Sequence, residues 1–196
     1  MNAAVIATVF CFIAVAELPD KTMIATLVMG SRSRPIFVWI GASAAFAVHV
    51  TLAVVAGRLL ELLPHRVLEL VVTVMFLAGA AFLLFVPEES EEKKGVREGQ
   101  APKATRAVPA IGAAFGVILL GEFGDLTQLL TVNFVAHYHL PWSVFIGALA
   151  GLMTVSALAA FGGRALLKVL PVAVIRRFGG VVLIGFAAYN IYELAR

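Results

Sequence analysis

The chain has 196 residues, of which 61% are hydrophobic and only 14% charged, with a formal net charge of +3. Its mean hydropathy of +0.99 excludes an ordinary soluble domain and is typical of an integral membrane protein. The basic residues lie mostly between apolar runs, where they usually record membrane topology, so nucleic-acid binding is not indicated. The single cysteine, Cys11, excludes an intramolecular disulfide.

Six apolar runs are each close to the roughly 20 residues that a transmembrane helix needs. They cover residues 2–29, 35–60, 66–87, 107–136, 141–168 and 171–195. We therefore predict an all-α integral membrane protein with six transmembrane helices, arranged as two inverted three-helix repeats. The stretch Ala14-Val15-Ala16 resembles a signal-peptide cleavage site, but the first run lacks a basic leader and we expect no cleavage there.

One acidic motif occurs in the first run and again in the fourth. Glu17-Leu18-Pro19-Asp20-Lys21-Thr22 is followed, 105 residues later, by Glu122-Phe123-Gly124-Asp125-Leu126-Thr127. A carboxylate at the bilayer centre costs roughly 2.5 to 3.5 kcal/mol on insertion scales, so four of them cost on the order of 10 kcal/mol. A cation that exchanges its hydration water for oxygen ligands is the partner that best explains them.

The repeat extends well beyond the motif. Residues 35–41 (PIFVWIG) match residues 141–147 (PWSVFIG) at an offset of 106, and Gly57-Arg58 matches Gly163-Arg164 at the same offset. Because three helices are an odd number, the second repeat enters the membrane from the opposite side, as in many secondary transporters. We divide the chain into repeat 1 (1–87), a charged linker (88–106) and repeat 2 (107–196).

Loop charges predict the orientation of the chain. Eleven basic residues fall on the side of the 88–106 linker and three on the other side. The positive-inside rule then places the linker in the cytoplasm and both termini outside, and we expect the plasma (inner) membrane. The glutamates of the linker leave a regulatory or metal-sensing role open.

The spacing within each motif is suited to sharing a ligand. In a regular helix, residues three apart lie about 60° from each other around the axis, so Glu17 and Asp20 project from one face, as do Glu122 and Asp125. The residue between them, proline in one motif and glycine in the other, can interrupt the helix and free backbone carbonyls as further oxygen ligands.

Five other polar residues are candidates for additional ligands or for a proton path. Thr22 and Thr127 fall away from the carboxylate face of a regular helix, so they join the site only if the helix is broken. Gln128 adds an amide next to the second motif, and Lys21 is expected to pair with a carboxylate when no metal is bound. His49, inside the second run, could relay protons, although the valine at the equivalent position of the other repeat favours simple packing.

The motifs supply an all-oxygen ligand set, because neither contains Cys or His. Such a set favours Mn²⁺, Ca²⁺ or Mg²⁺, whereas zinc and copper usually recruit histidine or cysteine. Desolvation and like-charge crowding favour the protonated form of some of these carboxyl groups when no metal is bound. Metal and protons would then compete for the same groups, which is the physical basis of cation/proton antiport.

The doubled motif resembles the E-x-G-D-(K/R)-(T/S) signature of the membrane family that includes Golgi calcium/manganese proton exchangers and bacterial manganese exporters. The resemblance covers essentially the whole chain. It implies that Glu17, Asp20, Glu122 and Asp125 bind the transported cation. A proline in the first motif and a leucine in place of the second basic residue depart from the signature, so the proton-to-metal ratio does not carry over.

The predicted function is secondary transport, namely export of Mn²⁺, or next Ca²⁺, in exchange for protons. The direction is implied by the resemblance alone. The predicted partners are divalent metal cations, protons and the lipid bilayer, and a homo-oligomer is compatible with the sequence. We expect no enzymatic activity and no cofactor apart from the metal carried as substrate.

Three alternatives stay open at this stage. A passive divalent-cation channel would ignore an imposed pH gradient. An intramembrane aspartyl hydrolase would use Asp20 and Asp125 as a proton-sharing dyad, in which the neighbouring glutamates have no part. A non-transporting membrane assembly factor would tolerate the loss of one acid, but a structural salt bridge from Glu17 to Lys21 explains only the first motif.

Overall fold

The computed structural model describes residues 1–18, 20–60, 62–85, 93–94, 96–100, 106–123, 125–169 and 172–195, and it is helical nearly throughout, with no strand in these ranges. The prediction of an all-α fold is confirmed for this part of the chain. The long helices are α1 (Ala3–Glu17), α2 (Lys21–Arg32), α3 (Pro35–Leu60), α4 (His65–Phe85), α6 (Ala107–Gly121), α7 (Leu126–Tyr138), α8 (Pro141–Val169) and α9 (Val172–Ala195). Most of the predicted 88–106 linker lies outside the described residues.

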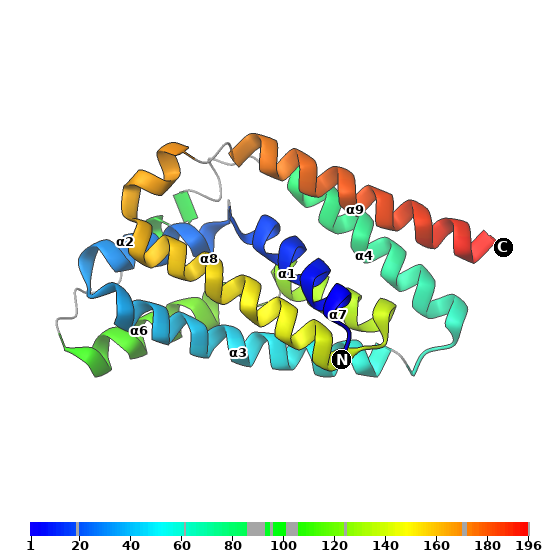
Figure 1. Cartoon of the computed structure of the whole chain (residues 1–196), viewed down its shortest axis with the longest axis horizontal. Coiled ribbons are helices and arrows are strands. Elements are labelled where there is room, and N and C mark those ends of the chain that lie inside the picture. Colours follow the sequence, from blue (N-terminus) through cyan, green and yellow to red (C-terminus); the bar gives the residue numbers. More distant parts are fainter. Residues whose placement is uncertain are drawn as a thin grey trace.

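The helices pack into an elongated bundle in which α4 and α9 lie side by side along one flank (Figure 1). The remaining helices pack around α3 and α8, which contact each other. α6 and α7 pack on α3, whereas α1 and α2 pack on α8. Each half of the chain therefore contributes helices to both sides of the bundle.

Two of the six predicted spans are broken near their middle. α1 and α2 meet at a bend of 71°, and α6 and α7 meet at a bend of 69°. The breaks fall at the two acidic motifs, because α1 ends at Glu17 and α2 begins at Lys21, while α6 ends at Gly121 and α7 begins at Leu126. The proline and glycine that the sequence offers as helix breakers, at positions 19 and 124, lie outside the described residues.

Long apolar helices make the bundle suited to a membrane. Within the described residues, α3 and the Pro141–Gly162 part of α8 are each long and apolar enough to cross the hydrocarbon core, and each bent pair meets the same criterion when taken as one span. That gives two spans, or up to four. α4 and α9 do not meet the criterion over the residues described.

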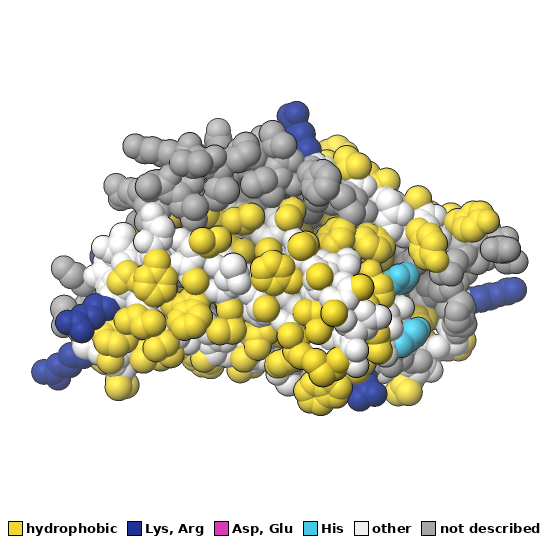
Figure 2. Space-filling model, in the orientation of Figure 1, with side chains coloured by type: hydrophobic (Ala, Val, Ile, Leu, Met, Phe, Trp, Pro, Cys, Tyr) yellow, Lys and Arg dark blue, Asp and Glu magenta, His cyan; other side chains and the backbone are white. Residues whose placement is uncertain are grey.

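The outside of the bundle carries apolar side chains. Leu52, Val55 and Leu59 of α3 are 45%, 53% and 61% exposed. In Figure 2, hydrophobic side chains cover the middle of the visible face, while Lys and Arg lie toward its edges. An apolar exterior of this kind suits contact with lipid tails and is a liability in water.

Two glycines bring helices of opposite halves into close contact. A Cβ atom at Gly41 of α3 would collide with the Ile111 carbonyl of α6, and one at Gly147 of α8 would lie 2.6 Å from the Ile6 carbonyl of α1. Gly147 follows Gly41 by 106 residues and Ile111 follows Ile6 by 105. The α3–α6 and α8–α1 contacts are therefore equivalent under the sequence repeat, and both require a residue without a side chain.

An aromatic cluster joins the α4–α9 pair to the rest of the bundle. Phe76 of α4 and Phe186 of α9 stack with ring centroids 5.3 Å apart, and Phe134 of α7 lies 6.0 Å from Phe76. Phe12 of α1 closes the cluster, 5.6 Å from Phe134. Contacts of this type add about 0.5 to 1.5 kcal/mol per pair beyond area burial, and this cluster anchors α1 and α7, the helices that flank the two breaks.

Candidate cation site

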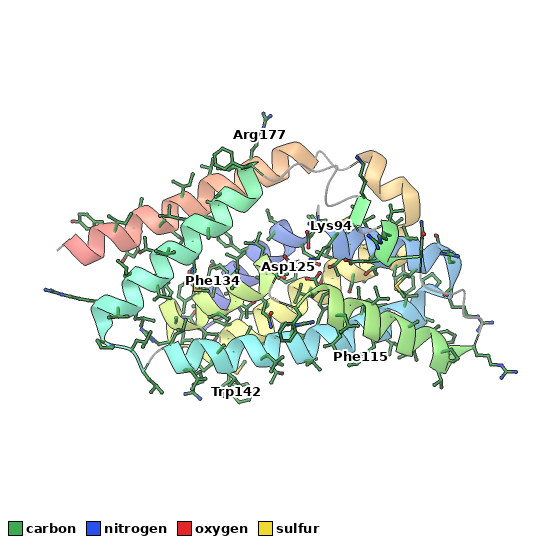
Figure 3. The ribbon with its side chains drawn as sticks, turned by 180° about the vertical axis from the view of Figure 1, so that it is seen from behind. Lys94, Phe115, Asp125, Phe134, Trp142 and Arg177 are labelled. Atoms are coloured by element: carbon green, nitrogen blue, oxygen red, sulfur yellow. The ribbon has the colours of Figure 1, made fainter. Side chains whose placement is uncertain are left out.

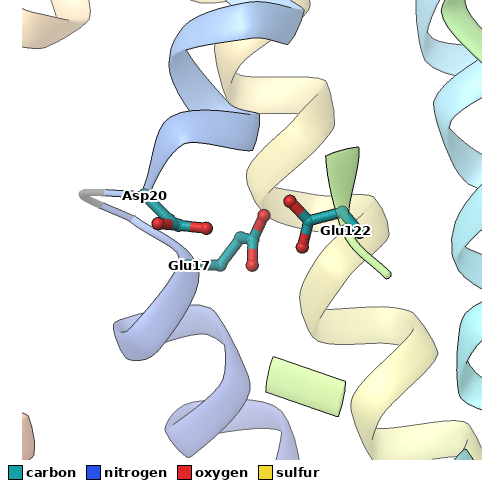
Figure 4. A group of neighbouring side chains, drawn as sticks. All are labelled: Glu17, Asp20 and Glu122. Atoms are coloured by element: carbon teal, nitrogen blue, oxygen red, sulfur yellow. The ribbon is translucent and has the colours of Figure 1, made fainter. Parts of the chain in front are cut away.

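Three carboxylates from the two motifs meet at the helix breaks, deep inside the bundle. Glu17 is the last residue of α1, Asp20 is the N-cap of α2 and Glu122 is the C-cap of α6. One carboxylate oxygen of each lies within 4.8 Å of the others, and the side chains converge in Figure 4. The residues are only 1%, 7% and 3% exposed. We call this group the three-acid cluster.

The carboxylates converge through the helix interruption that the motif residues suggested. In a regular helix, a spacing of three would place Glu17 and Asp20 on one face. Instead, α1 ends at Glu17 and the chain turns by 71° before α2 continues. The carboxylates meet because the helix is interrupted between them, and the third comes from the equivalent interruption in the other half.

The dimensions of the three-acid cluster suit a divalent cation. Three oxygens no more than 4.8 Å apart surround a point at most about 2.8 Å from each, close to the Ca²⁺–oxygen distances of 2.3–2.6 Å. A small inward movement of the side chains reaches bonding distance. A metal here would be the substrate of the protein rather than a resident cofactor.

The protein offers these carboxylates few hydrogen-bond donors. Among the described residues, neither carboxylate oxygen of Glu17 has a hydrogen-bond partner, and Oε1 of Glu122 also lacks one. A buried carboxylate without donors is strongly unfavourable unless it binds a cation or a proton. These unpaired oxygens therefore indicate a group that binds a positive ligand from outside the chain.

The helix ends add to the attraction for a cation. Glu17 and Glu122 lie at the C-terminal ends of α1 and α6, where the helix dipole is negative and backbone carbonyls lack partners within the helix. Asp20 lies at the N-terminus of α2, where its side chain makes no cap hydrogen bond and lies close to the Lys21 amide and to Asp125. Broken helices hold ions in this way in many membrane transporters.

The fourth predicted acid, Asp125, is held by other partners. Its Oδ1 accepts a hydrogen bond of 2.7 Å from the Leu126 amide, and its Oδ2 lies 3.1 Å from Nζ of Lys21, in the other half of the chain. Figure 3 shows Asp125 in the middle of the molecule. Asp125 therefore lies beside the three-acid cluster, within hydrogen-bonding reach of Asp20, and its ion pair with Lys21 joins the two breaks. A cation site made of all four acids stays a prediction.

The ion pair also bears on two of the alternatives. Lys21 pairs with Asp125 across the halves, rather than forming only a local bridge within the first motif. The Asp20 and Asp125 side chains do lie within hydrogen-bonding reach, as an aspartyl dyad requires. However, Asp125 also pairs with the Lys21 ammonium and accepts from the Leu126 amide, which a proton-sharing dyad does not require.

A small cavity lies next to the three-acid cluster, and several predicted polar residues line it. Glu122, His49, Thr127 and Gln128 contribute to its wall. Thr131, which the sequence argument did not select, lines it as well and donates a 2.7 Å hydrogen bond to the Thr127 carbonyl. Its signal was present in the sequence, since Thr131 follows Thr26 by 105 residues, in register with the motifs.

Thr22 does not line this cavity, whereas His49 lines it and also contacts a neighbouring helix. Thr22 is buried at 2% exposure on α2. His49 of α3 is 4% exposed, and its Nε2 lies 3.1 Å from the Leu119 carbonyl of α6.

A lipid-facing bundle with broken helices and a buried cluster of acids defines a membrane cation transporter. Residues 5–91 and 110–196 match the family described as divalent cation/proton antiporter GDT1. The chain belongs to this family.

Relatives from several organisms are similar over most of the chain. A GDT1-like protein of Synechocystis sp. is 25% identical over 192 residues, which cover 91% of this chain and 92% of the relative. GDT1-like protein 3 of Oryza sativa is 27% identical, with 92% and 71% covered. Protein PAM71, chloroplastic, of Arabidopsis thaliana is 27% identical over 96% of this chain, which spans 56% of the PAM71 length. No solved structure matches the chain.

Proposed function

We propose that this protein exports a divalent cation, Mn²⁺ as the first candidate and Ca²⁺ as the next, from the cytoplasm in exchange for protons, and that the three-acid cluster holds the cation in transit. The observation that carries the proposal is the burial of Glu17, Asp20 and Glu122 around one point, with unpaired oxygens on two of them. Such a group needs either a metal or protons to be stable. A cluster that binds metal and protons in turn can exchange one for the other across the membrane, which is antiport.

The charges of the site fit this exchange. With Lys21 and Asp125 paired, the three-acid cluster carries a formal charge of −3 when ionised, and one divalent cation leaves −1. Cytoplasmic metal would displace protons from the cluster, and external protons would later displace the metal. Asp125 would position Lys21 in the metal-free state.

An inverted repeat of six spans would supply the alternating access. The two segments that match the family begin and end 105 residues apart, the offset of the motifs. The contacts of Gly41 and Gly147 with the opposite halves are equivalent at nearly the same offset. Both observations support two like-folded halves that rock around a central site, with residues 1–87 and 107–196 as the halves.

The proposed orientation follows the loop charges. The 88–106 linker would face the cytoplasm and both termini the outside, in the plasma (inner) membrane, because basic residues are concentrated on the linker side. The cation would then enter from the side of the linker.

Flux measurements in proteoliposomes test the proposal. Wild-type protein should drive Mn²⁺ against its own gradient when a pH gradient is imposed, and Glu122→Gln should abolish this movement. Thr154→Val, an exposed position whose hydroxyl bonds within its own helix at 2.7 Å to the Ala150 carbonyl, should behave as wild type.

Other outcomes separate the alternatives. Metal flux that ignores the pH gradient would favour a channel. Folded wild-type protein that moves no metal under any gradient would overturn transport and favour an assembly factor or a hydrolase.

A further inference from the structure

The cavity beside the three-acid cluster contains a nitrogen ligand that the motifs lack. His49 lines this cavity together with Glu122, Thr127, Gln128 and Thr131. The cavity has room for roughly one water molecule. That is enough for a dehydrated divalent ion and too little for a hydrated one.

The hydrogen bond of the His49 ring determines which nitrogen is available. The Leu119 carbonyl, 3.1 Å from Nε2, can only accept, so Nε2 carries the hydrogen and Nδ1 carries a lone pair. Nδ1 is buried and has no hydrogen-bond partner among the described residues. An imidazole whose second nitrogen donates to a backbone carbonyl is the usual arrangement of a metal-ligating histidine, because that bond fixes the tautomer and the ring orientation.

Glu122 connects this cavity to the three-acid cluster. It lines the cavity and is also one of the three clustered acids. Its Oε1 is buried and unpaired within the described residues, as is Nδ1 of His49. Two buried atoms with lone pairs and no donor beside one small cavity are unfavourable without a ligand.

We propose that Nδ1 of His49 is a ligand of the transported cation, and that it makes the site prefer Mn²⁺ to Ca²⁺. Calcium sites are built from oxygen ligands, whereas imidazole is a better ligand for transition-metal ions. The inference rests on the proposed function and extends the path of the cation. His49 lies outside the three-acid cluster, so the ion would reach Nδ1 by moving from the cluster into the cavity, with Glu122 as the shared ligand. Val155 occupies the equivalent position of the other half, so the site contains one such nitrogen.

Pulsed electron paramagnetic resonance of Mn²⁺ bound to the purified full-length protein tests this directly. Mn²⁺ on the wild-type protein should show the magnetic coupling to a directly bonded ¹⁴N nucleus. His49→Gln should remove the coupling, and His139→Gln, in the α7–α8 turn, should retain it. Transport should show the same selectivity: in His49→Gln the KM for Mn²⁺ should rise about tenfold, while the KM for Ca²⁺ changes less than twofold.

The outcomes distinguish this inference from the proposed function. Mn²⁺ that binds the wild-type protein without ¹⁴N coupling, or coupling that persists in His49→Gln, would overturn the histidine ligand alone. Equal changes for Mn²⁺ and Ca²⁺ in transport would overturn its role in selectivity. Wild-type protein that binds no Mn²⁺ would overturn the proposed function as well.

Discussion

Glu17 is a buried acid that the described part of the protein leaves without partners, so a bound cation should stabilise the fold through it. It is 1% exposed, and both of its carboxylate oxygens lack partners among the described residues. Glu17→Gln replaces a buried carboxyl group that has no partner in the described chain with a neutral amide, so without metal the variant should unfold at the same temperature as the wild type or a few degrees higher.

The gain in folding stability that Mn²⁺ gives the wild type should be absent in Glu17→Gln. A ligand at a hundred times its Kd stabilises the folded state by about 2.7 kcal/mol, and Glu17→Gln should lose this gain with Mn²⁺. Thermal unfolding followed by tryptophan fluorescence, with and without Mn²⁺, provides the check. A full Mn²⁺-dependent shift in the variant would show that Glu17 is not a ligand.

The pair of Lys21 and Asp125 predicts a non-additive result. Asp125→Asn leaves an uncompensated ammonium beside the cluster, which should weaken Mn²⁺ binding at least about tenfold through repulsion of the cation. The double variant Lys21→Met with Asp125→Asn removes both charges, and most of the affinity should return. Mn²⁺ titration of the four proteins measures this coupling. If the double variant does not regain Mn²⁺ affinity, Asp125 is a direct ligand, as in the four-acid cage expected from the sequence.

At the scale of helices, the contacts of Gly41 and Gly147 predict a matched pair of effects. An added Cβ would meet a backbone carbonyl at both positions, whereas Gly112 of α6 has open space around it. Gly41→Ala and Gly147→Ala should each destabilise the fold by about 1 to 3 kcal/mol. Gly112→Ala should be neutral or stabilising by up to about 1 kcal/mol, since alanine favours the helix. Thermal unfolding of the three variants measures these changes in stability, and equal changes in all three would contradict the packing described.

The predicted runs agree well with the helices because hydropathy and breaker residues act locally. The run expected at 35–60 coincides with α3, and the runs at 2–29 and 107–136 each cover one broken pair to within two or three residues of its end. The sequence also indicated where the breaks fall, since a proline or glycine lies between the acids of each motif.

The partner of Lys21 could not be predicted in the same way. Lys21 lies four residues from Glu17 in sequence, yet it pairs with Asp125 across the bundle. The choice depends on how α2 and α7 meet after two bends of about 70°, which local pattern does not determine. The bond from His49 to the Leu119 carbonyl likewise depends on the packing of α3 against α6.

For the whole molecule, the loop charges predict which loops are accessible from outside the cell. In a Cys11→Ser background, a cysteine at Leu62, in the exposed α3–α4 turn, should react with an impermeant thiol reagent on intact cells. A cysteine at Gln100, exposed in the described part of the linker, should react only after lysis. The reverse pattern would invert the topology and the proposed direction of transport.

The central claim is that acids from both halves of the molecule hold one cation and exchange it for protons. Calorimetric titration of the purified protein with Mn²⁺, in buffers of different ionisation enthalpy, measures metal binding and proton release together. Mn²⁺ binding to the wild type should release at least one proton, and Glu17→Gln and Glu122→Gln should each abolish both signals. Wild-type binding in either variant, or binding without proton release, would contradict it.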